Sequence, residues 1–259
     1  MLERRVLDHD VAVLVAPELE SRGYLVAFTE RAGGVSDGPF RGLNLGLKSG
    51  DDPAVVMENR RRLIAALGIP EFACPRQTHS TNIAPVGPES AGKGFADPAE
   101  AFPATDALVT SSPGVPIAVL AADCIPLALV DPKSGRVAVV HAGWRGVAAG
   151  MIPAALAEFA DPDRVEAVVG PGVGPDHYEV GEDVAALVAA GSGGGAVTGR
   201  EGRRLLLDLP GTVGRTLETL GVGRVDRADQ CTACQADRFF SYRRDGRTGR
   251  QGLIAARLY

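Results

Sequence analysis

The stretch VPIAVLAADCIPLALVDPKSGRVAVVHAGWRG, residues 115–146, decides the fold and holds most of the residues with recognisable chemistry. Two apolar runs, Ile117–Ala121 and Ile125–Val130, are bounded by chain-breaking residues and predict buried strands. Asp131–Gly135 is typical of a turn, because proline stands near its start and glycine at its end. Arg136–Val140 is then predicted to be the returning strand of a hairpin.

The rest of the chain alternates irregularly between helical and strand-like patterns. Asp52 and Pro53 predict the start of a helix that ends near Gly68. Pro85–Thr105, rich in Gly, Pro, Ala and Glu, is predicted to be a surface excursion. Further strands are expected near 11–15, 24–28, 165–169, 204–207 and 253–258, and further helices near 147–160, 182–190 and 209–220. This irregular order, with at least one hairpin, predicts a mixed sheet.

Composition and charge narrow the class of protein. With 259 residues, 45% hydrophobic and 23% charged, the chain is neither disordered, collagen-like nor a disulfide scaffold. A chain of this length folds around its own core, so a bound metal would indicate chemistry rather than scaffolding. The formal charge of −5 argues against nucleic acid or an anionic membrane as partner. No repeat or shift in composition divides the chain, so one domain over residues 1–259 is expected.

The N-terminal sequence and the cysteines predict where the protein resides. The start, MLERRVLDHD, has no apolar segment of the kind that a signal peptide requires. Four cysteines in a chain of this length predict reduced thiols. We therefore expect a cytoplasmic protein.

Three residues near the hairpin could bind a metal. If 125–130 pairs with 136–140, Cys124 and His141 emerge at the same end of the hairpin, and His79 could join them from a distant loop. Three N/S ligands with an open fourth position are typical of a catalytic Zn²⁺ site. The alternative is a buried cysteine with two histidines bonded in the core, because no short ligand spacing such as HxH is present.

The same residues could instead carry out nucleophilic catalysis. Cys124 would be the thiolate and His141 its base, with Asp123 or His79 orienting the imidazole. The sequence does not separate a Cys–His dyad from metal ligation.

Two other features have weaker signals. Cys231 and Cys234 form a single CxxC that lacks the second pair of a zinc ribbon and the context of a thioredoxin motif, so structural or incidental thiols are expected. Trp144, the only tryptophan, could stack on a planar ligand beside His141 or pack in the core.

Seven segments together resemble the YfiH/laccase-domain family. They are FTERAGGVSDGPFRGLNLG, DDPAVVMENR, RQTHS, TDALVTSSPGVPIAVLAADCIPLALVD, VAVVHAGWRG, GPGVGPDHYEV and CTACQADRFFSYRRDGRTGRQ, in this order from about residue 25 to the C-terminus. The ordered combination of QxHS, ADCxP and HAGWRG is highly specific. Members of this family have been described as polyphenol oxidases, as purine nucleoside phosphorylases with adenosine deaminase activity, and as peptidoglycan editing factors.

The resemblance implies an α+β fold, a four-layer αββα sandwich with mixed sheets. It also implies that His79, Cys124 and His141 bind Zn²⁺, with copper as a possible alternative. Where the family often has Cys-Cys-Tyr-Glu-Val, this chain has Asp-His-Tyr-Glu-Val at 176–180, which leaves a copper role for those cysteines unsupported here. Four histidines are also too few for a multicopper centre.

The function that the resemblance implies is a zinc-dependent purine nucleoside phosphorylase with adenosine deaminase side activity. Its substrates would be inosine, adenosine, guanosine or methylthioadenosine together with phosphate. Alternatives are a hydrolase acting on a muropeptide precursor, a copper-dependent polyphenol oxidase, or a non-enzymatic metal- or thiol-handling protein. We expect a monomer that binds neither nucleic acid nor membranes.

Four further residues are predicted to bind the substrate. Arg60 and Arg145 are candidates for phosphate, because a guanidinium can bind it in a bidentate manner. Asn44 and Gln77 could hold ribose or base through their amides. For Arg60 the alternative is a solvated helix face. Asp123 is predicted either to orient the attacking water or to point away from the site in a structural role.

Overall fold

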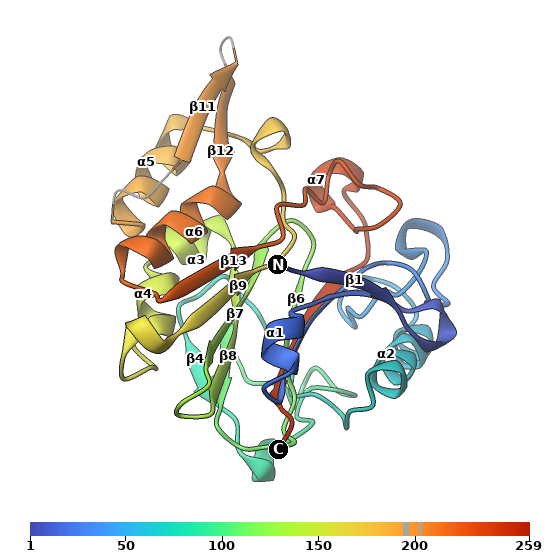
Figure 1. The fold of residues 1–259 in the computed structure, drawn as a ribbon. Coiled ribbons are helices and arrows are strands. Elements are labelled where there is room, and N and C mark those ends of the chain that lie inside the picture. The colour runs from blue at the N-terminus through green and yellow to red at the C-terminus, as the bar shows by residue number, and fades with distance from the viewer. Residues whose placement is uncertain (194–196, 202–203) are drawn as a thin grey trace.

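The computed structural model describes residues 1–193, 197–201 and 204–259. Two large sheets are stacked face to face, with helices on both outer sides (Figure 1). The first sheet has the strand order β1-β2-β3-β14-β6, and all its neighbours are antiparallel. Its strands are β1 (Glu3–Val6), β2 (Ala12–Val15), β3 (Tyr24–Thr29), β6 (Ile117–Ala121) and β14 (Gln251–Arg257).

The second sheet has six strands in the order β13-β9-β7-β8-β5-β4. Parallel pairs form both edges and antiparallel pairs the centre, so this sheet is mixed as predicted. The expected hairpin lies at its centre, with Ile125 opposite Ala142 and Asp131 opposite Arg136. The strands are β4 (Ile83–Pro85), β5 (Ala107–Thr110), β7 (Ile125–Asp131), β8 (Arg136–Ala142), β9 (Glu166–Val169) and β13 (Arg224–Arg227).

Helices form the two outer layers. α2 (Pro53–Leu67) packs against the five-stranded sheet, and four helices pack against the six-stranded sheet, namely α3 (Trp144–Ala148), α4 (Met151–Leu156), α5 (Glu182–Gly191) and α6 (Leu209–Thr219). Two one-turn helices, α1 (Pro17–Glu20) and α7 (Tyr242–Asp245), lie outside these layers. A small antiparallel sheet contains β10 (Glu179–Val180), β12 (Arg204–Asp208) and β11 (Val197–Glu201).

Three hydrophobic clusters fill the three interfaces between these layers. On β14, Leu253 faces the other sheet while Ile254 faces α2. On β7, Leu127 and Leu129 face the helices while Ala128 faces the first sheet. Strands buried on both faces need continuous apolar sequence, and each fully buried large aliphatic side chain stabilises the fold by about 1.5–3 kcal/mol. The αββα prediction is confirmed, and this double burial explains the two apolar runs at 117–121 and 125–130.

Local signals also explain where the helices begin and end. The side chain of Asp52 accepts a hydrogen bond from the Ala54 amide, and Gly68 ends α2 with a φ of 64°, as predicted. The helix expected over 147–160 is instead split into α3 and α4, because Gly150 adopts a φ of 87° between them. Pro153 stands in the first turn of α4, where its missing N–H is tolerated.

The prediction of a surface excursion at 85–105 is wrong in part. Phe95 and Ala101 are buried, and the Phe95 ring packs edge-on against Phe72 with ring centroids 4.9 Å apart. This segment covers the five-stranded sheet near α2 because its few apolar side chains complete the outer cluster. Within the described ranges, no helix is both long enough and apolar enough to cross a membrane.

Candidate metal centre

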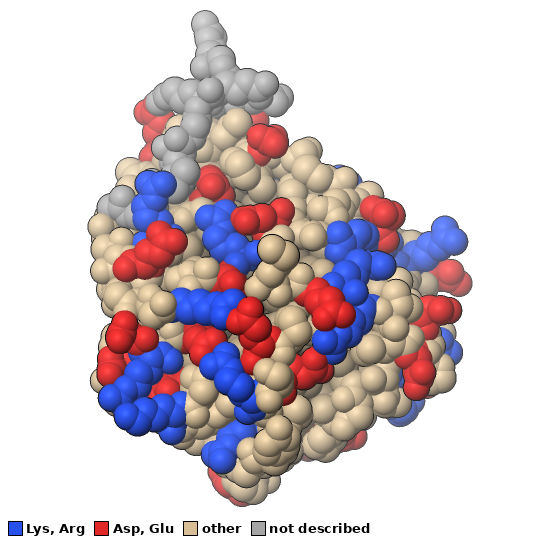
Figure 2. All heavy atoms as spheres, viewed as in Figure 1, with Lys and Arg blue, Asp and Glu red and all other residues tan. Residues whose placement is uncertain are grey.

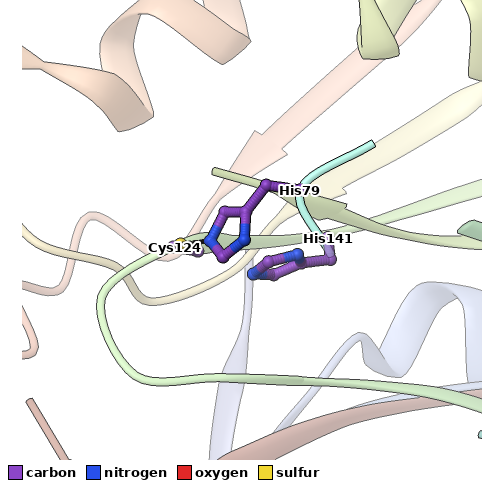
Figure 3. A group of neighbouring side chains, drawn as sticks. All are labelled: His79, Cys124 and His141. Atoms are coloured by element: carbon purple, nitrogen blue, oxygen red, sulfur yellow. Dashed lines mark hydrogen bonds between the residues drawn. The ribbon is translucent and has the colours of Figure 1, made fainter. Parts of the chain in front are cut away.

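The β7–β8 hairpin places two of the three predicted ligands. Cys124 directly precedes β7, and His141 lies opposite Pro126 near the end of β8. His79 comes from the loop before β4, at the neighbouring edge of the same sheet. The three side chains converge from these separate segments (Figure 3).

The donor atoms lie at distances that suit a metal ion. Cys124 Sγ is 3.6 Å from His79 Nε2, and the two imidazole centroids are 4.8 Å apart at 69°. All three donor atoms lie within 4.8 Å of one another. Tetrahedral zinc, with Zn–S near 2.3 Å and Zn–N near 2.0 Å, places neighbouring N and S ligands about 3.5 Å apart. The residues therefore fit Zn²⁺, and the His₂Cys set also fits copper.

A buried carboxylate that the sequence did not reveal holds two of these ligands. Asp106, directly before β5 and fully buried, accepts a 2.8 Å hydrogen bond from His141 Nδ1. Its oxygens also accept the backbone N–H groups of Thr78, His79 and Ser80 at 2.7–3.0 Å. Because Nδ1 of His141 is held by this hydrogen bond, its Nε2 is free to bind a metal. Carboxylates outside the ligand set often orient metal-binding histidines in the same way.

The electrostatics of the centre couple Cys124 to His141. Burial alone would raise the pKa of Cys124, but the neighbouring His141 and His79 lower it to about 6. Burial alone would lower the pKa of His141, but the Cys124 thiolate and the Asp106 carboxylate raise it to about 9. Burial would likewise raise the pKa of Asp106, yet its hydrogen bonds hold that pKa well below the usual range. Near neutral pH the pair is therefore thiolate and imidazolium.

Two backbone features make room for the centre. His79 and Asp123 both have positive φ, 63° and 92°, a conformation that is costly for residues with a side chain and is common at functional sites. Gly143 packs directly against the ligands: a Cβ on it would lie 2.7 Å from His79 Cδ2 and 2.9 Å from Cys124 Sγ. Only glycine fits there without moving a ligand.

The three ligands line a cavity of about 570 Å³. Five cationic side chains line it with them, and among its described lining residues there is no Asp or Glu; the cations are Lys48, Arg60, Arg76, Arg145 and Arg250. On the face shown in Figure 2, by contrast, acidic and basic side chains are interspersed. Several charged side chains of the molecule form ion pairs, as Arg22 does with Glu166. The cavity is thus cationic in a chain whose formal charge is −5.

The predicted phosphate ligands Arg60 and Arg145 differ in their surroundings. Arg60 is only 2% exposed and donates to the carbonyls of Leu45, Gly94 and Phe95, so the solvated alternative is wrong. Arg145 is exposed, its guanidinium stacks on Trp144 at 4.4 Å, and its side chain makes no hydrogen bond or ion pair with any described residue. Its guanidinium is therefore available to a ligand in the cavity.

The predicted amide ligands and Asp123 are bonded within the protein. The Gln77 amide bonds both backbone groups of Leu120, although Gln77 lines the cavity. Asn44 is fully buried, and its Oδ1 accepts from the Arg250 amide. Asp123 accepts 2.6 Å hydrogen bonds from Thr232 Oγ1 and the Arg243 amide. The orienting partner of His141 is thus Asp106, which corrects the expectation of Asp123 in that role.

Comparisons with known proteins agree with this fold. Residues 25–257 match the family model described as multi-copper polyphenol oxidoreductase laccase. A Deinococcus radiodurans protein named purine nucleoside phosphorylase is 45% identical over 235 residues, covering 88% of this chain and 87% of that protein. Escherichia coli purine nucleoside phosphorylase YfiH is 35% identical, with 92% and 96% covered. The crystal structure of YlmD from Geobacillus stearothermophilus matches with a TM-score of 0.88 and 33% identity, over 95% of this chain and 96% of that one.

Fold and site together define a class: an αββα sandwich with a His/Cys/His cluster at the end of its central hairpin. Within that class, the chain belongs to the laccase-domain family that contains YfiH and YlmD.

Proposed function

We propose that this protein is a zinc-dependent purine nucleoside phosphorylase with adenosine deaminase side activity. The observation that carries the proposal is the charge of the cavity: five cations and, among its described lining residues, no carboxylate surround the His/Cys/His cluster. Such a lining favours an anionic co-substrate, and phosphate is the anion that phosphorolysis consumes. The names of the relatives, purine nucleoside phosphorylase, point to the same reaction.

The cavity offers separate places for the two substrates. The unpaired guanidinium of Arg145, with Lys48 and Arg76, would bind phosphate. Trp144 and Tyr242, which also line the cavity, would stack against a planar base. A cavity of about 570 Å³ is in the range of small-molecule sites.

Phosphorolysis balances with the groups that these substrates supply. A phosphate oxygen forms a bond to C1′ of the ribose while the C1′–N9 bond breaks and its electron pair stays on the base. The proton of the hydrogen phosphate passes to the base, giving free base and ribose 1-phosphate. Cationic side chains hold the phosphate against the electron-poor C1′, so their contribution is positioning and charge compensation.

His79, Cys124 and His141 would hold Zn²⁺, which supplies Lewis-acid polarisation and makes water a stronger nucleophile near neutral pH. Asp106 fixes the His141 ring so that Nε2 points away from the carboxylate. In the deaminase reaction a water oxygen replaces the amino group at C6 of adenosine, and ammonia leaves. Asp123 would be a positioning residue. It accepts hydrogen bonds from Thr232 and from the Arg243 amide, and these hold Asp123 and with it the adjacent Cys124 in place.

The test is product analysis with the purified zinc-loaded protein. Inosine and phosphate should give hypoxanthine and ribose 1-phosphate, and adenosine without phosphate should give inosine. Both products should disappear in Cys124→Ala and after treatment with a chelator. Product formation that is equal in wild type and Cys124→Ala would contradict the proposal.

One observation favours a second candidate, a thiol hydrolase acting on an amide such as that of a muropeptide. Cys124, His141 and Asp106 stand in the order of nucleophile, base and orienting carboxylate, and the pKa of Cys124 is lowered to about 6. This candidate predicts that metal-free protein cleaves muropeptides and that an alkylating reagent on Cys124 abolishes the cleavage.

A further inference from the structure

A second group of sulfur and imidazole side chains lies outside the cavity lining. His177 ends a single 3₁₀ turn at Pro175–His177, and Cys231 and Cys234 belong to the segment between β13 and α7. His177 Nδ1 is 3.5 Å from Cys234 Sγ and 3.9 Å from Cys231 Sγ. All three donor atoms lie within 4.8 Å of one another.

We propose that His177, Cys231 and Cys234 form a second metal site, which takes a thiophilic divalent cation of the zinc class. The distances carry this proposal, because tetrahedral zinc places neighbouring N and S ligands about 3.5 Å apart and two S ligands somewhat further. Two residues from a CxxC and one from a distant turn meet within that range. The site neither overlaps the cavity cluster nor depends on the proposed reaction.

A backbone amide contacts the sulfur of Cys231. The Gly174 amide donates to Cys231 Sγ at 3.2 Å, a hydrogen bond that stabilises negative charge on sulfur. A Cβ on Gly174 would lie 3.2–3.3 Å from the Cys231 side chain, so the turn approaches the cysteine closely. Backbone hydrogen bonds from Gly172 to Gln230 and from Thr232 to Gly172 fix the two segments side by side. The donors are therefore positioned by backbone before any metal binds.

The site is also accessible to a metal ion from solvent. Asp176, His177 and Ala233 line an open hollow of about 790 Å³, and both His177 and Cys234 are exposed. Asp176, the residue before His177, adds a carboxylate to the same hollow. Three protein ligands at an open hollow leave a fourth position for water or for that carboxylate.

A metal in the second site would restrain the segments that hold Asp123, the residue before the cavity ligand Cys124. Thr232, between the two cysteines, donates to Asp123, and the Arg243 amide donates to the same carboxylate. The Arg243 guanidinium in turn donates to the His177 carbonyl at 3.1 Å. Asp123 precedes Cys124, so a metal that joins these two segments would restrain the backbone that carries a ligand of the cavity cluster. We therefore assign the second site a structural role.

Metal content and Co²⁺ spectroscopy test the proposal on the full chain, kept in a phosphine reductant. The apoprotein is reconstituted with Co²⁺, whose thiolate charge-transfer band grows with the number of bound thiolates. Wild type should bind two equivalents, and Cys124→Ala and Cys234→Ser one each. Cys124→Ala should keep about two thirds of the band, because two of the three ligating thiolates remain, and Cys234→Ser about one third. Circular dichroism of each variant confirms that it is folded.

A matched pair of histidine variants provides the control. His177→Ala should lose one equivalent, whereas His9→Ala, an exposed histidine outside both clusters, should keep two. The proposal is overturned if Cys234→Ser and His177→Ala each bind as many equivalents as wild type. It is also overturned if Cys231 and Cys234 form a disulfide in reductant while Cys124 stays reduced.

Discussion

The two Cys/His clusters contain the same kinds of ligand in different surroundings. The cavity cluster has one thiolate and two imidazoles at the end of the central hairpin, with a fully buried carboxylate behind it. The second cluster has two cysteine sulfurs and one imidazole on surface segments, with a backbone amide behind it. Cations and aromatic rings surround the first, whereas the second opens directly to solvent.

This difference shows what separates a centre suited to chemistry from one suited to holding the chain together. Ligand type and spacing alone would allow either cluster to bind zinc. Only the cavity cluster combines a carboxylate that orients a ligand, a space for substrate and unpaired cations for an anion.

The largest effect is expected from Gly143→Ala. The new methyl group would displace His79 or Cys124, and a misplacement of about 1 Å can cost roughly 100-fold in rate. Phosphorolysis should therefore fall at least about 100-fold, while the second cluster keeps its metal. Gly146→Ala is the matched control, since its nearest neighbour would be 3.5 Å from the added Cβ. Equal activity in the two variants would show that the cavity cluster does not need this space.

Asp106→Asn should weaken the cavity cluster by about 10–100-fold in metal affinity or kcat/KM, as removal of outer carboxylates does elsewhere. Asp131→Asn provides the control, because Asp131 is also buried and accepts hydrogen bonds from Ser134 in the turn of the same hairpin. Competition with a chromophoric chelator measures the affinity. If the two variants lose metal affinity equally, the loss comes from the hairpin fold and not from the orientation of His141.

Metal binding to the cavity cluster should release about one proton at pH 7.5. With the pKa of Cys124 at about 6 and that of His141 at about 9, the metal-free pair is thiolate and imidazolium, and a ligand imidazole must be neutral. Apparent affinity should rise about tenfold per pH unit between pH 6 and 9 and level off above. Calorimetry in buffers of different ionisation enthalpy measures the proton, in Cys234→Ser so that only one cluster binds. Release of no proton at this pH would contradict the ion pair.

The same pair has opposing effects on how the stability of the metal-free protein depends on pH. The lowered pKa of Cys124 stabilises the fold above the unfolded pKa, and this stabilisation is lost as pH falls through about 6. The raised pKa of His141 stabilises the fold below its unfolded pKa, and this contribution is lost as pH rises through about 9. Because one contribution grows and the other declines by similar amounts from about pH 6.5 to pH 9, denaturant unfolding of the apoprotein should give a nearly constant free energy of unfolding over this range. A change of about 2 kcal/mol or more across it would contradict the paired shifts.

The smallest effect is expected from Arg145→Ala. Loss of one exposed cation should raise KM for phosphate by about tenfold with little change in KM for inosine, since charge-assisted hydrogen bonds contribute about 1.5–3 kcal/mol at most. Arg61→Ala removes an exposed arginine of α2 and should leave both constants unchanged. An equal rise in both KM values would place Arg145 outside the phosphate site.

Local patterns predicted the parts of this molecule that depend on neighbouring residues in sequence. The hairpin follows from two apolar runs around a proline-glycine turn, and the closeness of Cys124 and His141 follows from its register. The sequence indicated His79 as a ligand only through its residue type. The position of its loop depends on Asp106, 27 residues further on. No periodicity marks that carboxylate, although a lone Asp before a buried strand was a signal that could have been used.

Long-range packing explains what sequence reasoning missed. Arg60 lies on a helix whose pattern does not show that residues 94–95 fold over it. The CxxC at 231–234 has a weak signal because its third partner, His177, lies 54 residues from Cys231. In each case the deciding contact joins segments that lie far apart in the sequence and meet only in the folded structure.

We expect activity to depend on the metal that the cavity cluster holds. Metal content measured beside phosphorolysis in wild type, His79→Ala, Cys124→Ala and His141→Ala tests this dependence. We expect each variant to remain folded, to lose one equivalent of zinc relative to wild type and to lose activity with it, because two remaining ligands hold zinc poorly. A wild-type protein that is fully active without metal in this cluster, or a variant that keeps its zinc and loses only activity, would contradict the account.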